Sequence, residues 1–393
     1  MWYTLQTPNS KFFLQFPVIP LKLQTPNSKL QTFLPYFCVR LTQQACMKKL
    51  FFLLSIITLF WSSCSNEFEV AAPWKEVPVV YAMLSPKDTA NYIRVEKAFL
   101  DPEQSALLIA QIADSLYYPV NEIQVFLERV STGERYVCVR VDGNLEGYVR
   151  STGVFASQPN WLYKYKTNDP SKKLMPGEAY RVVIERADGK DPVVGETTLP
   201  KDFFFVKPNP ALQPPMLNLD SPDIPTTIEW RTSVEGVYFN VALRIRYRET
   251  DLNGSLISRD SFVWHVVSNV RRTNVVAGTT GGFFRGLAEL GLSAFHKVLV
   301  DSIASTNTRL RYFDNIEILL EGGGAEIEEY LVTANANSGI TGAEIVSTFS
   351  NLSEGFGIVT GLNAVTFDKV RFTNNTVNAM NLNPETKALN FRN

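Results

Sequence analysis

Short segments of β-branched and aromatic residues, separated by turn residues, follow one another from Val77 to near the end of the chain. Apolar and polar positions alternate within them, which is typical of half-buried strands because successive side chains point to opposite faces of a sheet. The first two strands are predicted at Val77–Leu84 and Asn91–Phe99. A hairpin is predicted where Glu122–Val130 and Glu134–Val141 flank a turn that contains Gly133. The pattern therefore predicts a mainly β fold rather than a helical bundle.

Helical spacing interrupts the strands in the first half of the chain. Ala106, Ile109, Ala113 and Leu116 recur at intervals of three or four residues. This spacing predicts a single helix whose apolar face packs on a sheet. Asp101 is expected to cap the N-terminus of this helix.

The second half of the chain is also rich in strands. Six prolines lie between Lys207 and Pro225, where they remove backbone donors, so we predict a Pro-rich linker or the crossing of an edge strand over residues 201–225. Beyond it the predicted strands are Thr226–Thr232, Val237–Glu249, Asp260–Val267, Arg309–Leu320 and Val365–Thr373, with a short helix at Phe284–Leu292 and a helix or irregular crossover at Ala325–Ala334. The predicted organisation is one β domain over residues 77–200 and a second β-rich domain, with short inserted helices, over residues 226–393.

A short motif narrows the fold of the first domain. Leu174, Pro176, Gly177 and Tyr180 follow the pattern Leu-x-Pro-Gly-x-x-Tyr, which resembles the tyrosine corner of fibronectin type III domains. The resemblance implies an immunoglobulin-like or fibronectin III-like β-sandwich, in which Leu174 enters the core. Pro176 and Gly177 would turn the chain, and the Tyr180 hydroxyl would bond a backbone group upstream. Such a fold implies no activity by itself.

The charge of the chain is unevenly distributed. Its 38 basic and 39 acidic residues give a formal charge of −1, but residues 1–63 carry six Lys or Arg and no Asp or Glu. Within this stretch Met47 and two lysines precede the largely apolar run Leu50–Trp61, and two serines then precede Cys64. A basic start, an apolar run too short to span a bilayer and small residues at the end are typical of a signal peptide.

The end of this segment resembles the signal of bacterial lipoproteins, in which the cysteine becomes the first mature residue and carries lipid. The resemblance implies a signal peptide over residues 47–63, lipid attachment at Cys64 and a tether over residues 64–76. Two or three acyl chains would hold the protein stably on a membrane. An N-terminal transmembrane anchor, or an ordinary signal peptide with Cys64 free, is the alternative. Ser65–Glu69 resembles an export signal of some Bacteroidota lipoproteins and is otherwise a solvated tether.

Residues 1–46 contain a direct repeat, since Leu5–Lys11 recurs as Leu23–Lys29. The repeat lacks alternation and helix caps, so it is not typical of a folding unit. A signal peptide must also stand at the start of the nascent chain to be recognised. We therefore interpret residues 1–46 as a translated upstream extension, with Met47 as the true start. A genuine N-terminal extension is the alternative.

Three further stretches resemble one family. Tyr81–Pro86, Ile93–Leu100 and Phe349–Gly357 are similar to segments near the start and the end of a large uncharacterised family of Bacteroidota outer-membrane lipoproteins. The resemblance implies an outer-membrane location, on the periplasmic face or at the cell surface, and a β-rich architecture. It implies no activity, because the function of the family is itself unknown.

Motifs for catalysis and for cofactors are scarce. The two histidines, His265 and His296, are too far apart in sequence to form a His-Glu-x-x-His metal site. Gly355–Gly361 misses the dinucleotide fingerprint by one residue and Gly322–Gly324 lacks the lysine of a phosphate loop, so both are interpreted as turns. Cys138 lies in a strand-like run and is interpreted as a small buried hydrophobe. We expect no catalytic residue, cofactor or metal, and the balanced charge argues against a nucleic-acid partner.

The leading hypothesis is a non-enzymatic, lipid-anchored protein that acts in binding or as an accessory to an outer-membrane complex. Its partners would be the membrane, through the lipid, and an envelope protein such as a TonB-dependent transporter. One alternative is an exported hydrolase acting on glycans, with two carboxylates that only the fold brings together. Another is a structural, adhesin-like spacer, which requires no ligand pocket.

Overall fold

The computed structural model describes residues 76–98, 106–273, 284–336 and 349–393, which belong to one compact unit. Strands make up most of its regular structure, and the helices are few and short. Two hydrophobic cores organise these strands, and each core lies between two facing sheets. The fold is therefore mainly β, with an immunoglobulin-like sandwich followed by a second β-rich part with inserted helices.

The first sandwich opposes a sheet in the order β4-β3-β7-β8 to a sheet end in the order β16-β1-β2-β6-β5. Every neighbouring pair is antiparallel except β1 with β16. The strands are β1 Val77–Leu84, β2 Asn91–Ala98, β3 Ile123–Arg129, β4 Glu134–Val137, β5 Val139–Asp142, β6 Trp161–Tyr165, β7 Ala179–Arg186, β8 Val193–Thr198 and β16 Phe356–Phe372.

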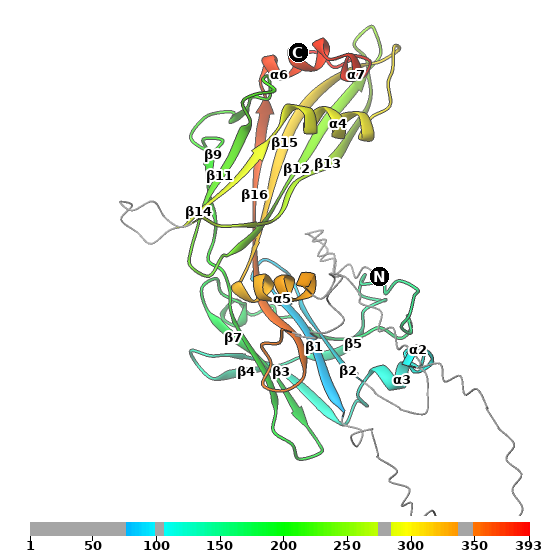
Figure 1. The fold of residues 1–393 in the computed structure, drawn as a ribbon, viewed down its shortest axis with the longest axis vertical. Coiled ribbons are helices and arrows are strands. Elements are labelled where there is room, and N and C mark those ends of the chain that lie inside the picture. Colours follow the sequence, from blue (N-terminus) through cyan, green and yellow to red (C-terminus); the bar gives the residue numbers. More distant parts are fainter. Residues whose placement is uncertain (1–75, 99–105, 274–283, 337–348) are drawn as a thin grey trace, which may run out of the picture. The chain divides into compact units, whose positions relative to one another are not determined.

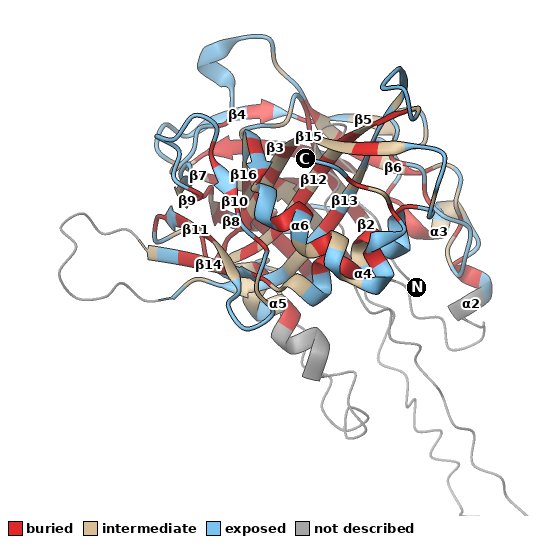
Figure 2. Ribbon diagram, turned by 90° about the horizontal axis from the view of Figure 1, so that it is seen from above, coloured by how far each residue is buried: buried red, intermediate tan, exposed pale blue. Residues whose placement is uncertain are grey.

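Alternation along these strands builds the first core. Val80, Ala82 and Leu84 of β1 are fully buried, and the residues between them are not. They share one hydrophobic cluster with Val125 and Leu127 of β3, on the opposite sheet. Figure 2 shows the alternation of buried and more exposed positions along the strands. Burying one such aliphatic side chain contributes about 1.5–3 kcal/mol, so this cluster holds the two sheets together.

The long strand β16 serves both sandwiches (Figure 1). Its first part runs parallel to β1, with Val79 opposite Phe356 and Leu84 opposite Gly361. Its second part pairs antiparallel with β15 (Leu310–Gly323), with Gly323 opposite Leu362. The sequence predicts that the first β domain ends at residue 200. Its sandwich also contains β16, which lies beyond that boundary, at residues 356–372. A pairing between positions so far apart in sequence leaves no local pattern.

The second sandwich opposes β13-β12-β15-β16 to the three-stranded sheet β14-β11-β9, and β10 adds a short parallel pair to β16. Its further strands are β9 Phe204–Lys207, β10 Met216–Leu217, β11 Thr226–Thr232, β12 Tyr238–Thr250, β13 Leu256–Arg271, β14 Phe284–Leu290 and β15 Leu310–Gly323. Both β9 and β10 lie within residues 201–225. That segment is therefore more than a linker, and β9 is an edge strand in it.

The helix predicted at Phe284–Leu292 is wrong, because this segment forms strand β14 as far as Leu290. β14 pairs along its whole length with β11, which places Gly286 opposite Trp230. Trp230 is fully buried, and a Cβ on residue 286 would lie 1.9 Å from its Cε2 atom. The glycine leaves room for the indole, so the strand is selected by tertiary packing. The helix follows directly, from Leu292.

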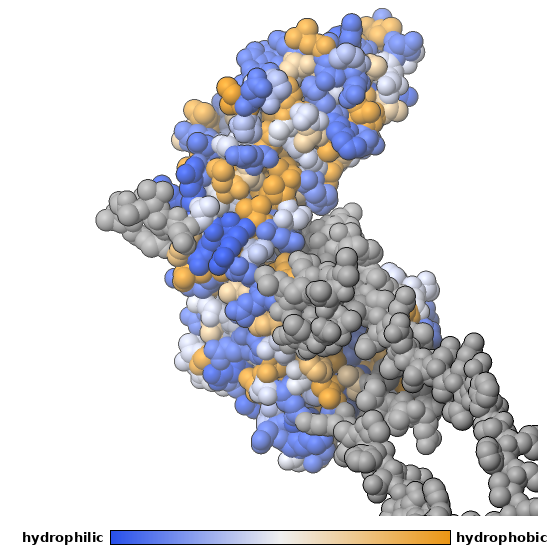
Figure 3. Space-filling view, in the orientation of Figure 1, coloured by the Kyte–Doolittle hydropathy of each residue, from blue (hydrophilic) through white to orange (hydrophobic). Residues whose placement is uncertain are grey.

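Short helices complete the fold: α2 Ala106–Ile109, α3 Ala113–Leu116, the 3₁₀ turn η1 Pro170–Lys172, α4 Leu292–Ser302, α5 Ala325–Ala336, α6 Asn374–Leu382 and α7 Pro384–Lys387. α4 and α6 pack on the second core through Phe295, Leu299, Val377 and Met380. Hydrophilic and hydrophobic residues are interspersed over the face of the molecule seen in Figure 3.

Two predictions for the first sandwich need correction. The single helix predicted from Ala106 is divided into α2 and α3, because Ile112 between them is extended, with φ −97° and ψ 111°; its predicted cap, Asp101, lies outside the described residues. The strand predicted at Glu134–Val141 is broken at Cys138. β4 pairs with β3, whereas β5 pairs with β6 in the opposite sheet. Cys138 enters the core at this crossing and is only 4% exposed, which confirms its interpretation as a buried hydrophobe.

Candidate functional site

The four tyrosine-corner residues lie together before and at the start of β7. Leu174 and Tyr180 are buried, whereas Pro176 is exposed at the turn. Gly177 has a φ of +84°, which favours glycine. The Tyr180 hydroxyl accepts a hydrogen bond from the Met175 backbone N–H at 3.0 Å. This bond joins β7 to the segment that precedes it.

Tyr180→Phe is expected to lower the free energy of unfolding by about 1–2 kcal/mol, because it leaves the Met175 N–H without its acceptor. Urea unfolding followed by circular dichroism measures this change. Tyr148→Phe is the matched control, since the Tyr148 hydroxyl is buried and has no partner among the described residues. A loss of stability in the control as large as that in Tyr180→Phe would contradict the role of the Tyr180 bond.

The segment just before the corner is held by side chains from both sheets of the first sandwich. Arg129 of β3 donates from Nη2 to the carbonyl oxygens of Ser171 and Lys173, at 3.1 and 3.0 Å. The Tyr165 hydroxyl of β6 donates to the carbonyl oxygen of Lys172 at 2.6 Å. Three consecutive carbonyls are therefore held, and the backbone from which the Lys173 side chain extends is fixed.

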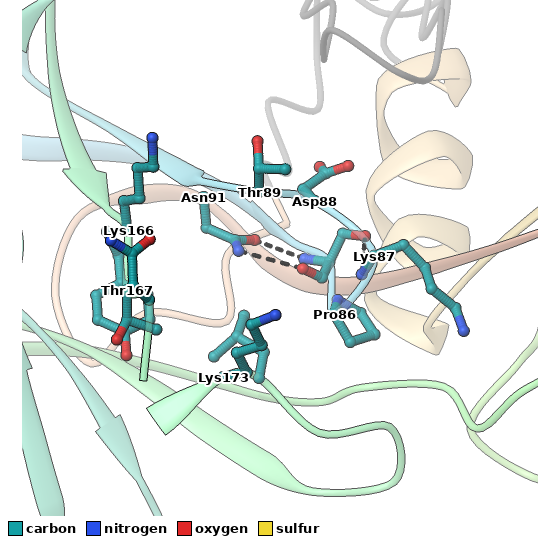
Figure 4. Close-up of a pocket in the computed structure, with 12 residues that line it drawn as sticks. Pro86, Lys87, Asp88, Thr89, Asn91, Lys166, Thr167 and Lys173 are labelled. Carbon is teal, nitrogen blue, oxygen red and sulfur yellow. Dashed lines mark hydrogen bonds between the residues drawn. The ribbon is translucent and has the colours of Figure 1, made fainter. Parts of the chain in front are cut away.

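A cavity of about 500 Å³ opens beside this segment (Figure 4). Its lining comes from three stretches of chain: the turn between β1 and β2, the end of β6, and the residues just before the corner. The lining residues are Ser85, Pro86, Lys87, Asp88, Thr89, Asn91, Tyr165, Lys166, Thr167, Asn168, Lys173 and Leu174. The volume lies within the range of small-molecule sites, and polar side chains dominate the lining.

The turn between β1 and β2 is locked by Asn91. Its Oδ1 accepts from the Ser85 N–H at 2.7 Å, and its Nδ2 donates to the Ser85 carbonyl oxygen at 3.1 Å, as the dashed lines in Figure 4 show. Both residues are buried. Because one amide satisfies both backbone groups, the turn that carries Lys87, Asp88 and Thr89 is held in one conformation.

Three lysines and Asp88 give the cavity its charge. Lys87 extends away from the other two in Figure 4 and pairs with Asp202 at 2.8 Å. The Lys173 amine points toward the turn between β1 and β2. Neither Lys166 nor Lys173 forms an ion pair or a side-chain hydrogen bond with another residue of the described ranges. Lys166 contributes to the lowered pKa of Glu146, and no ion pair of Lys173 is found among the described residues.

Asp88 and Glu321 are carboxyl groups with raised pKa values. Burial raises the pKa of Asp88 to about 6. Burial also raises the pKa of Glu321, on β15, to about 7, and the nearby charge of Asp88 contributes to this shift. The two carboxyls come from distant parts of the sequence and interact through space, and perturbed pairs of this kind are typical of functional sites. Asp88 lines the cavity, and Glu321 does not.

Asn351, in the family-like stretch Phe349–Gly357, clamps two backbones together. Its Oδ1 accepts from the Val359 N–H at 2.9 Å, and its Nδ2 donates to the Val359 carbonyl oxygen at 2.7 Å. The same Nδ2 donates to the carbonyl oxygen of Glu196 on β8 at 3.1 Å. The asparagine thus ties β16 to β8, which is a structural role rather than a ligand-binding one.

Glycines that follow Asn351 in the sequence allow β16 to lie close to β1. Gly355 and Gly357 have φ values of +95° and +125°. A Cβ on Gly357 would lie 1.9 Å from the Val80 carbonyl oxygen. Gly357 and Gly361 lie inside β16, and Gly322 and Gly323 end β15, so the interpretation as turns is wrong for these four glycines. Gly355 lies in a bend before β16, and Gly324 connects β15 to α5. At Gly357 the backbone of β1 occupies the space that a side chain would need, and at Gly322 the rings of Phe203 and Phe239 occupy it.

Cys138 and His296, whose side chains could take part in catalysis or metal binding, are both buried. Burial raises the pKa of the Cys138 thiol to about 12, so it is protonated and unreactive at neutral pH. The buried His296 accepts at Nδ1 from Asn383 Nδ2 at 2.8 Å, because the Asn383 Oδ1 already accepts from the Glu385 N–H. Within the described ranges, no group of three or more His, Cys, Asp or Glu side chains could hold a metal ion.

The predicted lipid-attachment residue Cys64 lies outside the described residues. So do residues 1–46, the predicted signal peptide at 47–63 and the tether as far as residue 75. Of the helices that the structure describes, none combines the length and the apolar character needed to cross a bilayer.

Sequence reasoning missed the cavity. A signal was present, because Lys164, Lys166, Lys172 and Lys173 fall within ten residues of one another. These lysines mark a basic stretch of surface, but they meet the turn between β1 and β2 only because Asn91 lies opposite Tyr165 in the pairing of β2 with β6.

No family model matches the chain, and no curated protein matches it. Among solved structures, the crystal structure of the C-terminal globular domain of an oligosaccharyltransferase from Pyrococcus abyssi aligns with 61% of this chain at 8% sequence identity and a TM-score of 0.21. The alignment covers 44% of that chain, less than half of its length. So low a score supports no argument about fold or function.

Proposed function

We propose that this protein is a lipid-anchored component of the cell envelope, tethered through Cys64 to the outer membrane, and that it acts in binding or as an accessory rather than as an enzyme. The observation that carries the proposal is the sequence around the predicted lipidation site. A basic start at Met47, the apolar run Leu50–Trp61 and two serines precede the cysteine. The first strand begins soon afterwards, at Val77, which supports a short tether followed by a folded body.

Metabolic labelling with palmitate tests the anchor. We expect the wild-type chain to incorporate label and to partition into the detergent phase, because two or three acyl chains hold a protein stably on a membrane. Cys64→Ala should lose both properties. Cys138→Ala is the matched control and should keep both, because this thiol is buried in the first core. Label retained in Cys64→Ala, or absent from the wild-type chain, would contradict the proposal.

The accessory role predicts a partner in the same membrane. A TonB-dependent transporter, or another envelope protein, is expected to co-purify with the wild-type chain from a mild detergent extract. The same preparation from cells that express Cys64→Ala should recover less of it, because an unanchored chain is no longer concentrated at the membrane surface. Recovery of the chain alone from both extracts would argue against an accessory role.

A glycan-active hydrolase is the second candidate, and the raised pKa values of the carboxyls Asp88 and Glu321 favour it. One group with a pKa near neutrality can serve as a general acid while a neighbour serves as base or nucleophile. If this function holds, Asp88→Asn and Glu321→Gln should each lower the rate of glycan hydrolysis by about 100-fold or more. Glu289→Gln, which changes an exposed carboxylate on β14, should leave it unchanged. Absence of hydrolysis across a glycan panel would exclude this candidate.

A further inference from the structure

We propose that the cavity beside the turn between β1 and β2 binds an acidic saccharide, that is, a sugar that carries a carboxylate or phosphate group. The inference names a ligand class for the binding role proposed above and rests on that role. It is carried by the charge of the cavity, by the polar groups left available in its lining and by the rigidity of its walls.

The charge of the cavity favours an anion. Lys87 is compensated by Asp202 at 2.8 Å, whereas Lys166 and Lys173 form no ion pair within the described ranges and outnumber the one carboxyl group of the lining, Asp88. An ammonium group donates up to three hydrogen bonds and carries a full charge, so it suits the oxygens of a carboxylate or a phosphate. Concave walls concentrate the field of such charges on a ligand that enters.

The other lining residues favour an anionic ligand that also carries hydroxyl groups, as a sugar does. The Thr167 Oγ1 accepts from the Asp169 N–H at 3.1 Å, so its own O–H is free to donate to a ligand. Thr89 and Asn168 add a hydroxyl and an amide to the same lining. A cavity of about 500 Å³ is far larger than a single anion requires, and an apolar ligand would leave these polar groups without partners.

The walls are organised before a ligand binds. Asn91 locks the turn that carries Thr89, through two hydrogen bonds to Ser85. Arg129 holds the carbonyl oxygen of Lys173 at 3.0 Å. A site that is already ordered loses less conformational entropy on binding, and such a loss would otherwise weaken the complex.

Isothermal titration calorimetry of the full chain in detergent tests the proposal. The probes are galacturonate, glucose 6-phosphate, glucose and inorganic phosphate. We expect at least one of the two acidic sugars to bind about tenfold more tightly than glucose and than inorganic phosphate. Galacturonate and glucose 6-phosphate separate the two acidic groups, and whichever binds more tightly identifies the preferred one.

Substitutions assign the binding to this cavity. Lys166→Ala and Lys173→Ala should each weaken binding of the acidic sugar about tenfold, and Lys173→Arg should retain most of it. Lys190→Ala is the matched control, because Lys190 is exposed, pairs with Asp188 at 2.7 Å and does not line the cavity. Thermal unfolding of each variant at the wild-type temperature shows that the fold is intact.

Three results would overturn the proposal: no heat of binding at millimolar concentrations, equal binding of glucose or inorganic phosphate, and unchanged affinity in both Lys166→Ala and Lys173→Ala. The binding test and the test of the lipid anchor can fail independently of each other. Cys64→Ala should titrate like the wild-type chain, so a failure of binding leaves the labelling result standing, and a failure of labelling leaves the titration interpretable.

Discussion

Arg311→Ala is expected to lower the free energy of unfolding by about 3–5 kcal/mol, as breaking one side of a buried ion pair generally does. Arg311 and Glu249 are 4% and 6% exposed, and the Arg311 Nε donates to the Glu249 carboxylate at 2.8 Å. The Arg311 Nη1 also donates to the carbonyl oxygens of Ala304 and Leu389, at 2.8 and 2.9 Å. The substitution thus leaves a buried carboxylate and two carbonyls with fewer donors. Urea unfolding at neutral pH measures the loss.

The same pair gives the stability a defined dependence on pH. Burial by itself raises the pKa of Glu249, but hydrogen bonds from Arg311 and Arg309 outweigh it and hold the pKa below the ordinary value of 4.5. A carboxylate with a lower pKa in the folded state stabilises the fold above its unfolded pKa and loses that contribution as the pH falls through the folded value. The wild-type chain should therefore lose this contribution as the pH falls below about 4.5, whereas Arg311→Ala, which lacks one of the hydrogen bonds that lower this pKa, should show a weaker loss of stability over the same pH range.

An exposed pair provides the control for Arg311. Lys297 and Asp301 on α4 lie at 3.1 Å, and their side chains are 77% and 61% exposed. Lys297→Ala should change the free energy of unfolding by no more than about 0.5 kcal/mol, because solvent screens such pairs. Comparable losses in Lys297→Ala and Arg311→Ala would show that burial is not the source of the effect.

Gly357→Ala is expected to lower the free energy of unfolding by about 3 kcal/mol or more, because it combines backbone strain with a collision. Gly357 has a φ of +125°, and its added Cβ would lie 1.9 Å from the Val80 carbonyl oxygen. Backbone atoms cannot move aside as a flexible side chain can, so the parallel pairing of β16 with β1 has to separate. Hydrogen exchange should report this as lost protection along β1, which Tyr180→Phe would not produce.

Gly254→Ala separates the effect of backbone strain from the effect of the steric collision. Gly254 has a φ of +89°, and no atom lies within 4 Å of the position its Cβ would take. This variant carries the conformational cost alone, about 1–2 kcal/mol. If Gly254→Ala and Gly357→Ala destabilise the protein equally, the close approach of β16 to β1 contributes nothing.

The pattern of apolar and polar residues predicted the strands and turns that are determined by residues close together in the sequence. The bounds of β1 and β11 agree with the predictions, because their alternating positions face a core on one side only. Gly133 has a φ of +69° in its predicted hairpin turn. Predictions failed where contacts between residues distant in the sequence determine the local structure. Phe284–Leu290 is a strand because Trp230 requires Gly286 opposite it, and Cys138 ends a strand because the chain changes sheets there.

The cavity could not be predicted for a similar reason. Lys166 and Lys173 are near neighbours in sequence, but Lys87 and Asp88 reach them only through the pairing of β2 with β6. The coupling of Asp88 with Glu321 depends on an even longer separation along the chain. Spacing in sequence carries no information about such distances, whereas the corner motif around Tyr180 is local and could be recognised from seven residues.

The strand β16 imposes an order on biogenesis. As the polypeptide leaves the ribosome, residues 77–198 emerge first, but the neighbour that covers the open side of β1 begins only at residue 356. Until then the N-terminal half has an unpaired strand edge, of the kind that invites aggregation. A chain truncated anywhere before residue 356 therefore lacks a strand in both sandwiches.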